Sequence, residues 1–177
     1  MTRFGGPAFR IDRDNINTDE IIPARYLTES SKIALQPHLL EDLLIDGKKF
    51  DNSAPELQQA SVLISRKNFG CGSSREHAVW VLEVNDISVV IAESFARIFR
   101  QNMYNCGMMA IALPAETIER LFSRFSGAET RLETHMDQQI FIFRSADHGE
   151  QVPFDLTGFD RELVKAGGWV EYADGKY

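Results

Sequence analysis

Residues that build cross-links or metal centres are scarce in this chain. Only two cysteines, Cys71 and Cys106, and four histidines occur among its 177 residues. Two cysteines cannot form a disulfide framework, and a structural zinc or an iron–sulfur cluster usually takes three or four Cys or His ligands. None of the histidines stands at a ligand-like spacing from the cysteines. We therefore expect this chain alone to bind no metal, so that any iron must come from another chain.

An excess of basic residues and a long apolar run are also missing. The chain has 19 Lys and Arg residues against 26 Asp and Glu residues, a net charge of −7. Nucleic acids and anionic membranes call for a basic face, so neither is expected as a partner. No run approaches the roughly 20 apolar residues that span a bilayer. The first residues lack the apolar core of a signal peptide, and a cytoplasmic location is expected.

The chain does contain enough apolar sequence for one core, because 44% of its 177 residues are hydrophobic. This length favours a single domain over residues 1–177. The middle alternates strand and helix patterns, with Ser94 as a helix cap and Pro114 at a first helical position. The predicted elements, in order, are strand 60–65, helix 78–84, strand 87–92, helix 94–104, strand 108–113 and helix 114–122. Such units pair in parallel, and ligands collect beyond the carboxyl ends of their strands.

The two flanks are less regular. On the amino-terminal side we expect a strand at 9–11, a polar turn at 14–19, an exposed loop at 28–36 and a helix at 39–45. On the carboxyl-terminal side we expect strands at 130–134, 139–143 and 152–156, and a helix at 160–166 that ends at Gly167. The fold class is therefore α/β, with a mixed β tail.

The most informative segment joins the first strand of the middle region to its helix. It reads NFGCGSSREHA over residues 68–78. A glycine-rich turn into a helix directs backbone N–H groups and the positive end of the helix dipole at an anion. Arg75 adds a planar fork suited to a carboxylate, although the dipole disfavours an arginine there unless an anion binds nearby. No Gly-Lys-Ser/Thr ending follows, which argues against a nucleoside triphosphate.

Several residues of this segment have two interpretations. Ser73 is either a catalytic base or nucleophile, or the N-cap of a capping box with Glu76. Both roles can coexist if Ser74 caps the helix while Ser73 faces the ligand. His77 is either a base or a hydrogen-bonded structural residue. Cys71 is either an activated thiol at a helix start or a small residue in a tight turn.

Four segments stand in the order found in small subunits of the aconitase superfamily. They are DNINTDEIIPARYL at 14–27, the 68–78 segment, SFARIF at 94–99 and AGG at 166–168. Over most of its length the chain resembles these subunits, and most closely the short type of the 3-isopropylmalate dehydratase family. The resemblance implies one swivelling β/β/α domain that closes over a large subunit bearing a [4Fe–4S] cluster. It also implies conversion of 2-isopropylmalate into 3-isopropylmalate, by dehydration and rehydration, in leucine biosynthesis.

The resemblance assigns roles to individual residues. It implies that Ser73 is the base that removes a proton next to a carboxylate, while the open iron of the partner's cluster acts as Lewis acid on the departing hydroxyl. Arg75 is implied to clamp a carboxylate of the hydroxy-dicarboxylate substrate, assisted by Ser74 and by the N–H groups of the turn. Asp19 matches an aspartate near the family's active site and is expected to support its electrostatics.

In this family, substrate choice is attributed to the loop after Tyr26-Leu27, at about residues 26–36 here. Homoaconitase-like members place an arginine directly after that pair to hold a further carboxylate. This chain has Thr28 there, expected to face the substrate, followed by Glu29, which repels a carboxylate. A tricarboxylate such as homoaconitate is thus disfavoured, while citramalate or a dimethylmalate remains an alternative. Cys106, where many relatives have a polar residue, receives no role.

Two hypotheses come from other functional classes. The chain can be a non-catalytic binding module that retains the swivel fold. It can also be a stand-alone hydrolase with Cys71 as its nucleophile. The combination of Ser73, Arg75 and Asp19 favours the dehydratase, since a pure scaffold does not need these three residues together.

Overall fold

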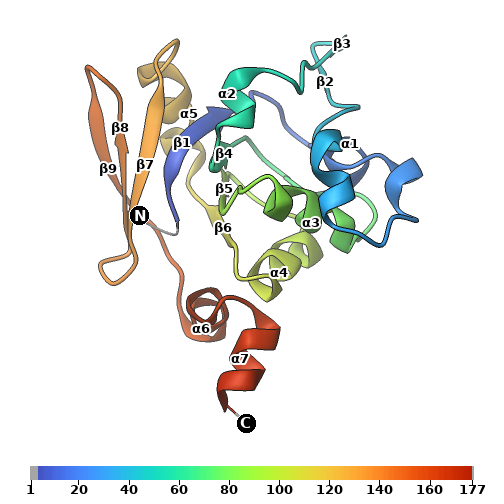
Figure 1. The fold of residues 1–177 in the computed structure, drawn as a ribbon. Coiled ribbons are helices and arrows are strands. Elements are labelled where there is room, and N and C mark those ends of the chain that lie inside the picture. The colour runs from blue at the N-terminus through green and yellow to red at the C-terminus, as the bar shows by residue number, and fades with distance from the viewer. Residues whose placement is uncertain (1–3, 177) are drawn as a thin grey trace.

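The computed structural model describes residues 4–176 and contains a seven-stranded mixed sheet (Figure 1). In spatial order its strands are β6 (Met109–Ala112), β5 (Val89–Ala92), β4 (Val62–Ile64), β1 (Gly6–Arg10), β7 (Thr130–His135), β8 (Ile140–Arg144) and β9 (Gly149–Pro153). The first four run parallel to one another, and the last three are antiparallel. β1 joins the two halves, because it pairs in parallel with β4 and antiparallel with β7. A separate hairpin consists of β2 (Leu44–Ile45) and β3 (Lys48–Lys49).

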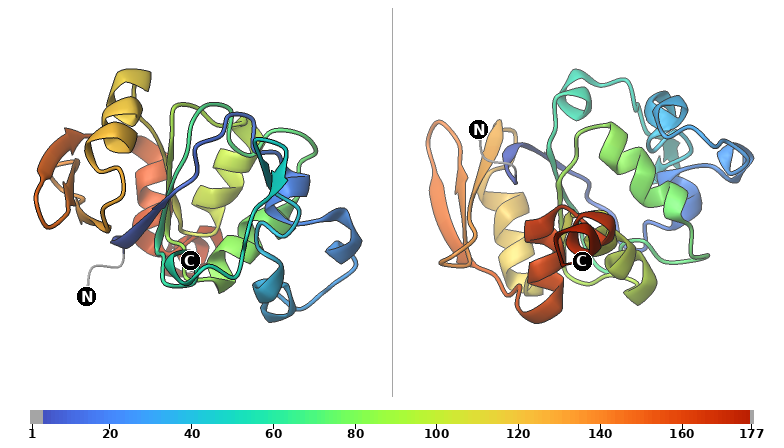
Figure 2. Two further views of the ribbon diagram at one scale, coloured as in Figure 1. Left: turned by 90° about the horizontal axis from the view of Figure 1, so that it is seen from above. Right: turned by 60° about the horizontal axis from the view of Figure 1, so that its bottom comes forward.

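The helices gather around the parallel half of the sheet. They are α1 (Thr18–Ile21), α2 (Pro55–Gln58), α3 (Glu76–Val84), α4 (Arg97–Asn105), α5 (Ala115–Arg124), α6 (Gly158–Ala166) and α7 (Trp169–Lys176), with 3₁₀ helices η1 (Ala24–Tyr26) and η2 (Ile33–His38). In Figure 1 the antiparallel strands lie at the left, α1 and α3 at the right, and α6 with α7 at the bottom. Both views of Figure 2 show α5 beside β7. The helices α1 and α3 are in contact and lie together at one end of the sheet.

Burial explains why the two halves of the sheet differ in sequence. Every residue of β4 and β5 is buried, so these strands are continuous apolar runs, as is typical of parallel strands covered on both faces. In β7 the buried residues Thr130, Leu132 and Thr134 alternate with more exposed ones, the pattern of a strand with one solvated face. The buried apolar side chains of both halves belong to one core cluster.

The predicted α/β class and the alternation of strands and helices in the middle of the chain are confirmed, with two corrections to helix starts. α4 begins at Arg97 with Ala96 as its N-cap, so Ser94 does not cap it. Instead, Ser94 Oγ accepts a hydrogen bond from Asn68 N–H at 2.8 Å. Pro114 is the N-cap of α5 with ψ 147°, one residue before the helix rather than inside it.

The predicted helix at 39–45 is wrong. Leu40 has φ 58°, which an α-helix of L-residues does not accept, and the segment ends in strand β2. Asp46 and Gly47 follow with φ 52° and 75° and turn the chain into β3, as a type I′ turn requires. The apolar spacing of Leu39, Leu40 and Leu43, all buried, is helix-like, but irregular turns bury them instead.

The remaining expectations differ mainly in boundaries. The strand expected at 9–11 ends at Arg10, and the polar turn at 14–19 leads into α1. The exposed loop at 28–36 ends inside η2. The last strand lies at 149–153 instead of 152–156, whereas α6 ends as predicted at Gly167, whose φ of 101° is left-handed. α7 was not predicted.

Candidate active site

The candidate site lies beyond the carboxyl ends of β1, β4 and β5, where the loops that follow these strands bond to one another. The backbone bonds are Asn15 N–H to Lys67 O (2.9 Å), Gly70 N–H to Ile16 O (2.8 Å), Thr18 N–H to Cys71 O (2.9 Å), Phe69 N–H to Ser94 O (3.0 Å) and Ala96 N–H to Phe69 O (3.0 Å). Parallel bridges between Asn17 and Cys71 and between Phe69 and Phe95 continue the sheet past its strands. The glycine-rich turn is therefore held on both sides by backbone bonds, which do not depend on side-chain identity.

Gly70 is required where this turn approaches α4. Its φ of 80° is left-handed, and a Cβ at this position would lie 2.2 Å from Cγ of Phe99. Phe99 is 3% exposed and packs edge-on against Phe69, with ring centroids 5.5 Å apart. Any side chain at Gly70 would therefore displace a buried ring.

Arg75 and Asp19, predicted separately as site residues, form an ion pair between Arg75 Nη1 and Asp19 Oδ1. The Arg75 side chain is only 17% exposed, whereas that of Asp19 is 59% exposed. The carboxylate thus reaches the arginine from the solvent side. No other hydrogen bond of this guanidinium involves residues 4–176, so its remaining N–H groups are available to a ligand.

The predicted capping box at Ser73 is wrong. α3 begins at Glu76, and its N-cap is Arg75, whose φ of −145° and ψ of 121° are extended and whose side chain makes no capping bond. Ser74 does not cap the helix either. A capping box occurs instead in α1, where Asn17 Oδ1 accepts from Glu20 N–H at 2.9 Å and Glu20 reaches back to Asn17 N–H. The first N–H groups of α3 therefore have no side-chain cap.

Ser73 and Ser74 are exposed, and neither hydroxyl makes a hydrogen bond to any residue in 4–176. Ser73 is held through its backbone, because the buried Thr18 hydroxyl donates to Ser73 O at 2.7 Å. Both hydroxyls are therefore exposed next to the Arg75–Asp19 pair.

Thr28 is exposed and follows η1. The segment around Thr28 is linked to α3 by His77. His77 Nε2–H donates to the carbonyl oxygen of Glu29, the residue after Thr28, at 2.9 Å. His77 is thus a hydrogen-bonded residue, the second of its two interpretations. No hydrogen bond or ion pair joins Thr28 to Ser73 or Arg75, and the role of Thr28 in substrate binding stays a prediction.

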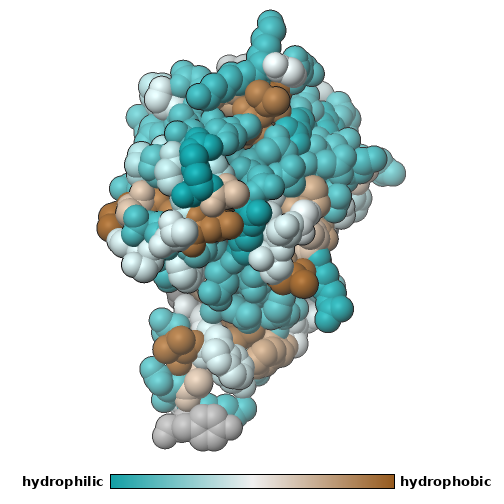
Figure 3. Space-filling model, turned by 90° about the vertical axis from the view of Figure 1, so that its right-hand side faces the viewer, coloured by the Kyte–Doolittle hydropathy of each residue, from teal (hydrophilic) through white to brown (hydrophobic). Residues whose placement is uncertain are grey.

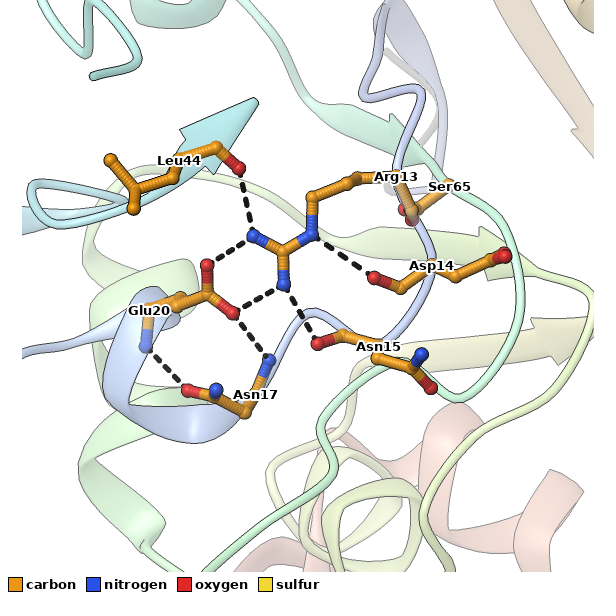
Figure 4. A network of polar contacts seen from close by, with 7 residues as sticks. All are labelled: Arg13, Asp14, Asn15, Asn17, Glu20, Leu44 and Ser65. Atoms are coloured by element: carbon orange, nitrogen blue, oxygen red, sulfur yellow. Dashed lines mark hydrogen bonds and ion pairs between the residues drawn. The ribbon is translucent and has the colours of Figure 1, made fainter. Parts of the chain in front are cut away.

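Arg13 is the structural residue that sequence reasoning missed (Figure 4). All five N–H groups of a guanidinium have acceptors here. Nε donates to Asp14 O at 3.0 Å, Nη1 to Leu44 O at 2.8 Å, Nη2 to Asn15 O at 2.9 Å, and both Nη atoms pair with the carboxylate of Glu20. Arg13 therefore fixes the turn that precedes α1, and with it the helix that carries Asp19.

The charges of this network reinforce each other. Burial alone raises the pKa of Glu20, but the hydrogen bonds from Arg13 and from Asn17 N–H, together with the charge of Arg13, outweigh burial, so this pKa is lowered. The hydrogen bond to Glu20 raises the pKa of Arg13. Both groups consequently stay ionised around neutral pH.

The two cysteines lie in different surroundings. Cys71 is half-buried in the turn, and no histidine within residues 4–176 hydrogen-bonds to its sulfur, so the described part of the chain lacks the base that activates a cysteine nucleophile. Cys106 lies outside the site, at the C-cap of α4. Burial raises the pKa of its thiol to about 11, with Glu83 adding to the effect.

Within residues 4–176, no group of three His, Cys, Asp or Glu side chains is arranged to hold a metal ion. The donors that this part of the chain brings together therefore do not fit an iron–sulfur cluster, which takes three or four thiolate or imidazole ligands. The same residues include no helix long and apolar enough to cross a membrane.

Figure 3 shows the side of the molecule at the right of Figure 1, where α1 and α3 lie. Hydrophilic residues cover most of this face, and hydrophobic ones form separate patches. The large apolar side chains that are exposed in the described chain include Phe159 of α6 and Trp169 and Val170 of α7.

Comparisons with known proteins give a consistent picture. The family model of the aconitase C-terminal domain matches residues 2–116. The 3-isopropylmalate dehydratase small subunit of Granulibacter bethesdensis is 38% identical over 158 residues, which cover 86% of this chain and 74% of that protein. The subunit of the same name from Geobacillus kaustophilus is 36% identical over 171 residues, covering 94% and 85% of the two chains.

A solved structure has a similar fold along nearly the whole chain. The crystal structure of 3-isopropylmalate dehydratase from Methanocaldococcus jannaschii superimposes with a TM-score of 0.76 at 28% sequence identity. The match covers 98% of this chain and 94% of that one. The relatives and the superposition therefore agree on one family.

Proposed function

The chain belongs to the aconitase C-terminal domain family and, within it, to the 3-isopropylmalate dehydratase small subunits, so we propose that it acts with a large subunit. Together the two subunits would interconvert 2-isopropylmalate and 3-isopropylmalate. Subunits with this name are parts of a hydro-lyase. The observation that best supports the proposal is that, beyond the carboxyl ends of the parallel strands, Arg75 pairs with Asp19 close to two serine hydroxyls that have no hydrogen-bond partner among residues 4–176.

Ser73 is the proposed base. As an alkoxide it takes the proton from the carbon next to a substrate carboxylate, and as a hydroxyl it returns this proton when water adds back in the opposite sense. The uncapped N–H groups at the start of α3 and the guanidinium of Arg75 supply the positive potential that favours an alkoxide. The hydrogen bond to its carbonyl fixes the backbone of Ser73, and its hydroxyl, which has no partner among residues 4–176, can rotate toward the substrate.

Arg75 binds the substrate, and Asp19 positions Arg75. Arg75 uses the N–H groups that Asp19 leaves unoccupied to hold a substrate carboxylate, assisted by the Ser74 hydroxyl. Asp19 keeps the guanidinium oriented and supports the electrostatics of the site. Thr28 is the proposed contact to the side chain of the malate.

The proposal assigns the [4Fe–4S] cluster to the large subunit, because the described residues of this chain offer no ligand set for it. A small subunit by name implies a larger partner. We further propose a heterodimer of the two subunits, closure of this domain by a swivel motion, and a cytoplasmic location. None of the steps assigned to Ser73, Arg75 and Asp19 depends on a cluster ligand from this chain.

The decisive experiment is anaerobic turnover of 2-isopropylmalate by this chain mixed with the cluster-loaded large subunit of the same organism. We expect conversion that disappears when either chain is omitted. Ser73→Ala should lower kcat by about 10²- to 10⁴-fold, the usual contribution of a positioned acid or base, and should leave assembly of the two chains intact. Ser126→Ala, at an exposed serine outside the site, is the matched control. Full activity of Ser73→Ala would refute the proposed base.

Other substrates and reagents separate the alternatives. Citramalate and homocitrate are tested beside isopropylmalate, and conversion of citramalate alone would keep the mechanism but change the substrate. A complex without turnover would favour the binding module. Hydrolysis by this chain alone, lost in Cys71→Ser, would favour the cysteine hydrolase.

A further inference from the structure

The segment from Thr28 to Gln36, called the 28–36 loop below, is anchored at both ends and weakly held between them. At its start the Tyr26 ring stacks on His38, with centroids 3.8 Å apart. Near its end Leu35 is fully buried. Residues 30–34 are all exposed, and Ile33 is 63% exposed. The position of the exposed part of the loop therefore depends on contacts made between these anchors.

The side-chain contacts that join the loop to more distant parts of the described chain lead to α3 and the residue after it. His77 Nε2–H donates to Glu29 O at 2.9 Å, Lys32 Nζ lies 3.3 Å from Glu83 Oε2 and 5.4 Å from the Trp80 ring centroid, and Asn85 Nδ2 donates to Gln36 O at 3.1 Å. The helix residues 77, 80 and 83 recur every three positions and share one face. The loop therefore runs along this face, from the first turn of α3 to its C-cap.

These contacts differ in what they can position. Lys32 and Glu83 are 45% and 40% exposed, and exposed ion pairs contribute little. The Asn85 bond lies next to Leu35, where the loop is already anchored. The His77 bond is partly buried and ends on a backbone atom. His77 also follows Arg75 by two residues, so among the hydrogen bonds of residues 4–176 this one connects the start of the loop to the turn that carries Arg75.

We propose that His77 is a positioning residue: its imidazole latches the 28–36 loop to the first turn of α3 and thereby places Thr28 against a malate held by Arg75. Its consequence for catalysis depends on the function proposed above, whereas the latch itself is a property of this chain. A carbonyl only accepts hydrogen bonds, so the latch needs a donor at the position of Nε2. A glutamine at residue 77 can supply one from its side-chain amide, and an alanine cannot.

Tryptic cleavage of the full chain after Lys32 tests the latch without any activity. Cleavage requires the loop to open, and its rate follows the open population when opening is fast. We expect His77→Ala to raise the rate of this cut about fivefold, the factor that one ordinary hydrogen bond contributes. His77→Gln should keep the parent rate. His135→Ala, an equal substitution on β7, is the control, and an unchanged melting temperature of His77→Ala would show that the opening is local.

Steady-state kinetics with the large subunit tests the consequence. His77→Ala should raise KM for 2-isopropylmalate several-fold and change kcat much less, because Ser73 and Arg75 stay in place. His77→Gln should restore KM. A merely structural residue would lower the melting temperature and the amount of active enzyme without this split.

Two results would overturn the proposal. If His77→Ala is cleaved after Lys32 no faster than the parent chain, there is no latch. If cleavage accelerates but KM stays at the parent value, the latch does not position the substrate contact. If the parent chain turns over no malate at all, the proposed function fails, and the cleavage rates still decide whether the latch exists.

Discussion

Arg13 and Glu20 illustrate how the segment that carries Asp19 depends on one guanidinium whose N–H groups all have acceptors. The pair lies between the turn at 14–16 and the strand β2, and it fixes the position of α1, which carries Glu20. Removing either partner would leave the other partly buried and without its counter-ion. The free-energy cost of that unpaired charge is larger than the stabilisation that the pair itself provides.

The pH dependence of stability follows from the lowered pKa of Glu20. The unfolded chain binds a proton at Glu20 at higher pH than the folded one does. The pair therefore contributes fully above the ordinary glutamate pKa of about 4.3, and this contribution is lost as the pH falls through the lower folded value. We expect Glu20→Gln to lower the free energy of unfolding by roughly 1–3 kcal/mol at pH 7 and to flatten its decline in acid.

Urea unfolding between pH 3 and pH 7 measures this effect. Glu162→Gln, at an exposed carboxylate of α6 without an ion pair among residues 4–176, is the control. Parallel acid limbs for the parent chain and Glu20→Gln would contradict the assignment.

At the residue scale, sequence patterns predicted the turn residues and missed the contacts. Ser73, Arg75 and Asp19 stand in recognisable segments, but Asp19 and Arg75 are 56 positions apart and meet only because β1 pairs with β4. Arg13 and Glu20 are seven residues apart, and they meet because the chain turns between them before α1 rather than through a regular element that holds both. Such pairs depend on tertiary structure, and no local pattern predicts them.

At the scale of elements, the turn between β4 and α3 is shaped by Gly70, and a matched glycine separates the two reasons. Gly127 also has a left-handed φ, 69°, yet a Cβ there would meet nothing within 4 Å. Gly127→Ala should therefore cost only the backbone strain of about 1–2 kcal/mol. Gly70→Ala adds the clash with Phe99, and overpacking costs typically 1–3 kcal/mol more.

Urea midpoints of the two variants test this difference. Gly70→Ala should be the less stable variant, and combining it with Phe99→Leu should recover part of the loss. Equal midpoints for Gly70→Ala and Gly127→Ala would mean that the Phe99 ring moves aside freely.

Element boundaries were harder to predict than element types. The Ser-x-x-Glu pattern before α3 is typical of a capping box, but the chain stays extended through Arg75 because the turn is bonded to the loops after β1 and β5. Tertiary hydrogen bonds here override a local preference. α7 was missed because Gly167 and Gly168 indicate the end of a helix, and no element was predicted for the eight residues after them.

At the scale of the whole molecule, the sheet divides the chain into a buried parallel half and an antiparallel half with one solvated face. The apolar runs of β4, β5 and β6 made the parallel half predictable. The placement of β1 between the halves was not predictable, because its partners β4 and β7 lie far away in the sequence.

Hydrogen exchange should show a gradient of local stability. Amides of β4 and β5 lie in strands with paired neighbours on both sides and fully buried side chains, so we expect them to exchange slowest. Amides of residues 30–34 should exchange fastest, because these residues are exposed and carry few backbone hydrogen bonds. Exchange followed by mass spectrometry of overlapping peptides measures both. Protection of 30–34 equal to that of β5 would contradict the weak hold on the loop.

The backbone ladder that joins the three loops after β1, β4 and β5 has a practical consequence for protein engineering. It keeps the reacting groups on a frame that no residue between 30 and 34 contributes to. Those five positions, together with the exposed Thr28, can therefore serve as an exchangeable cassette: libraries that randomise them, while retaining Leu35 and the latch at His77, should redirect selectivity among substituted malates at little expense in folding.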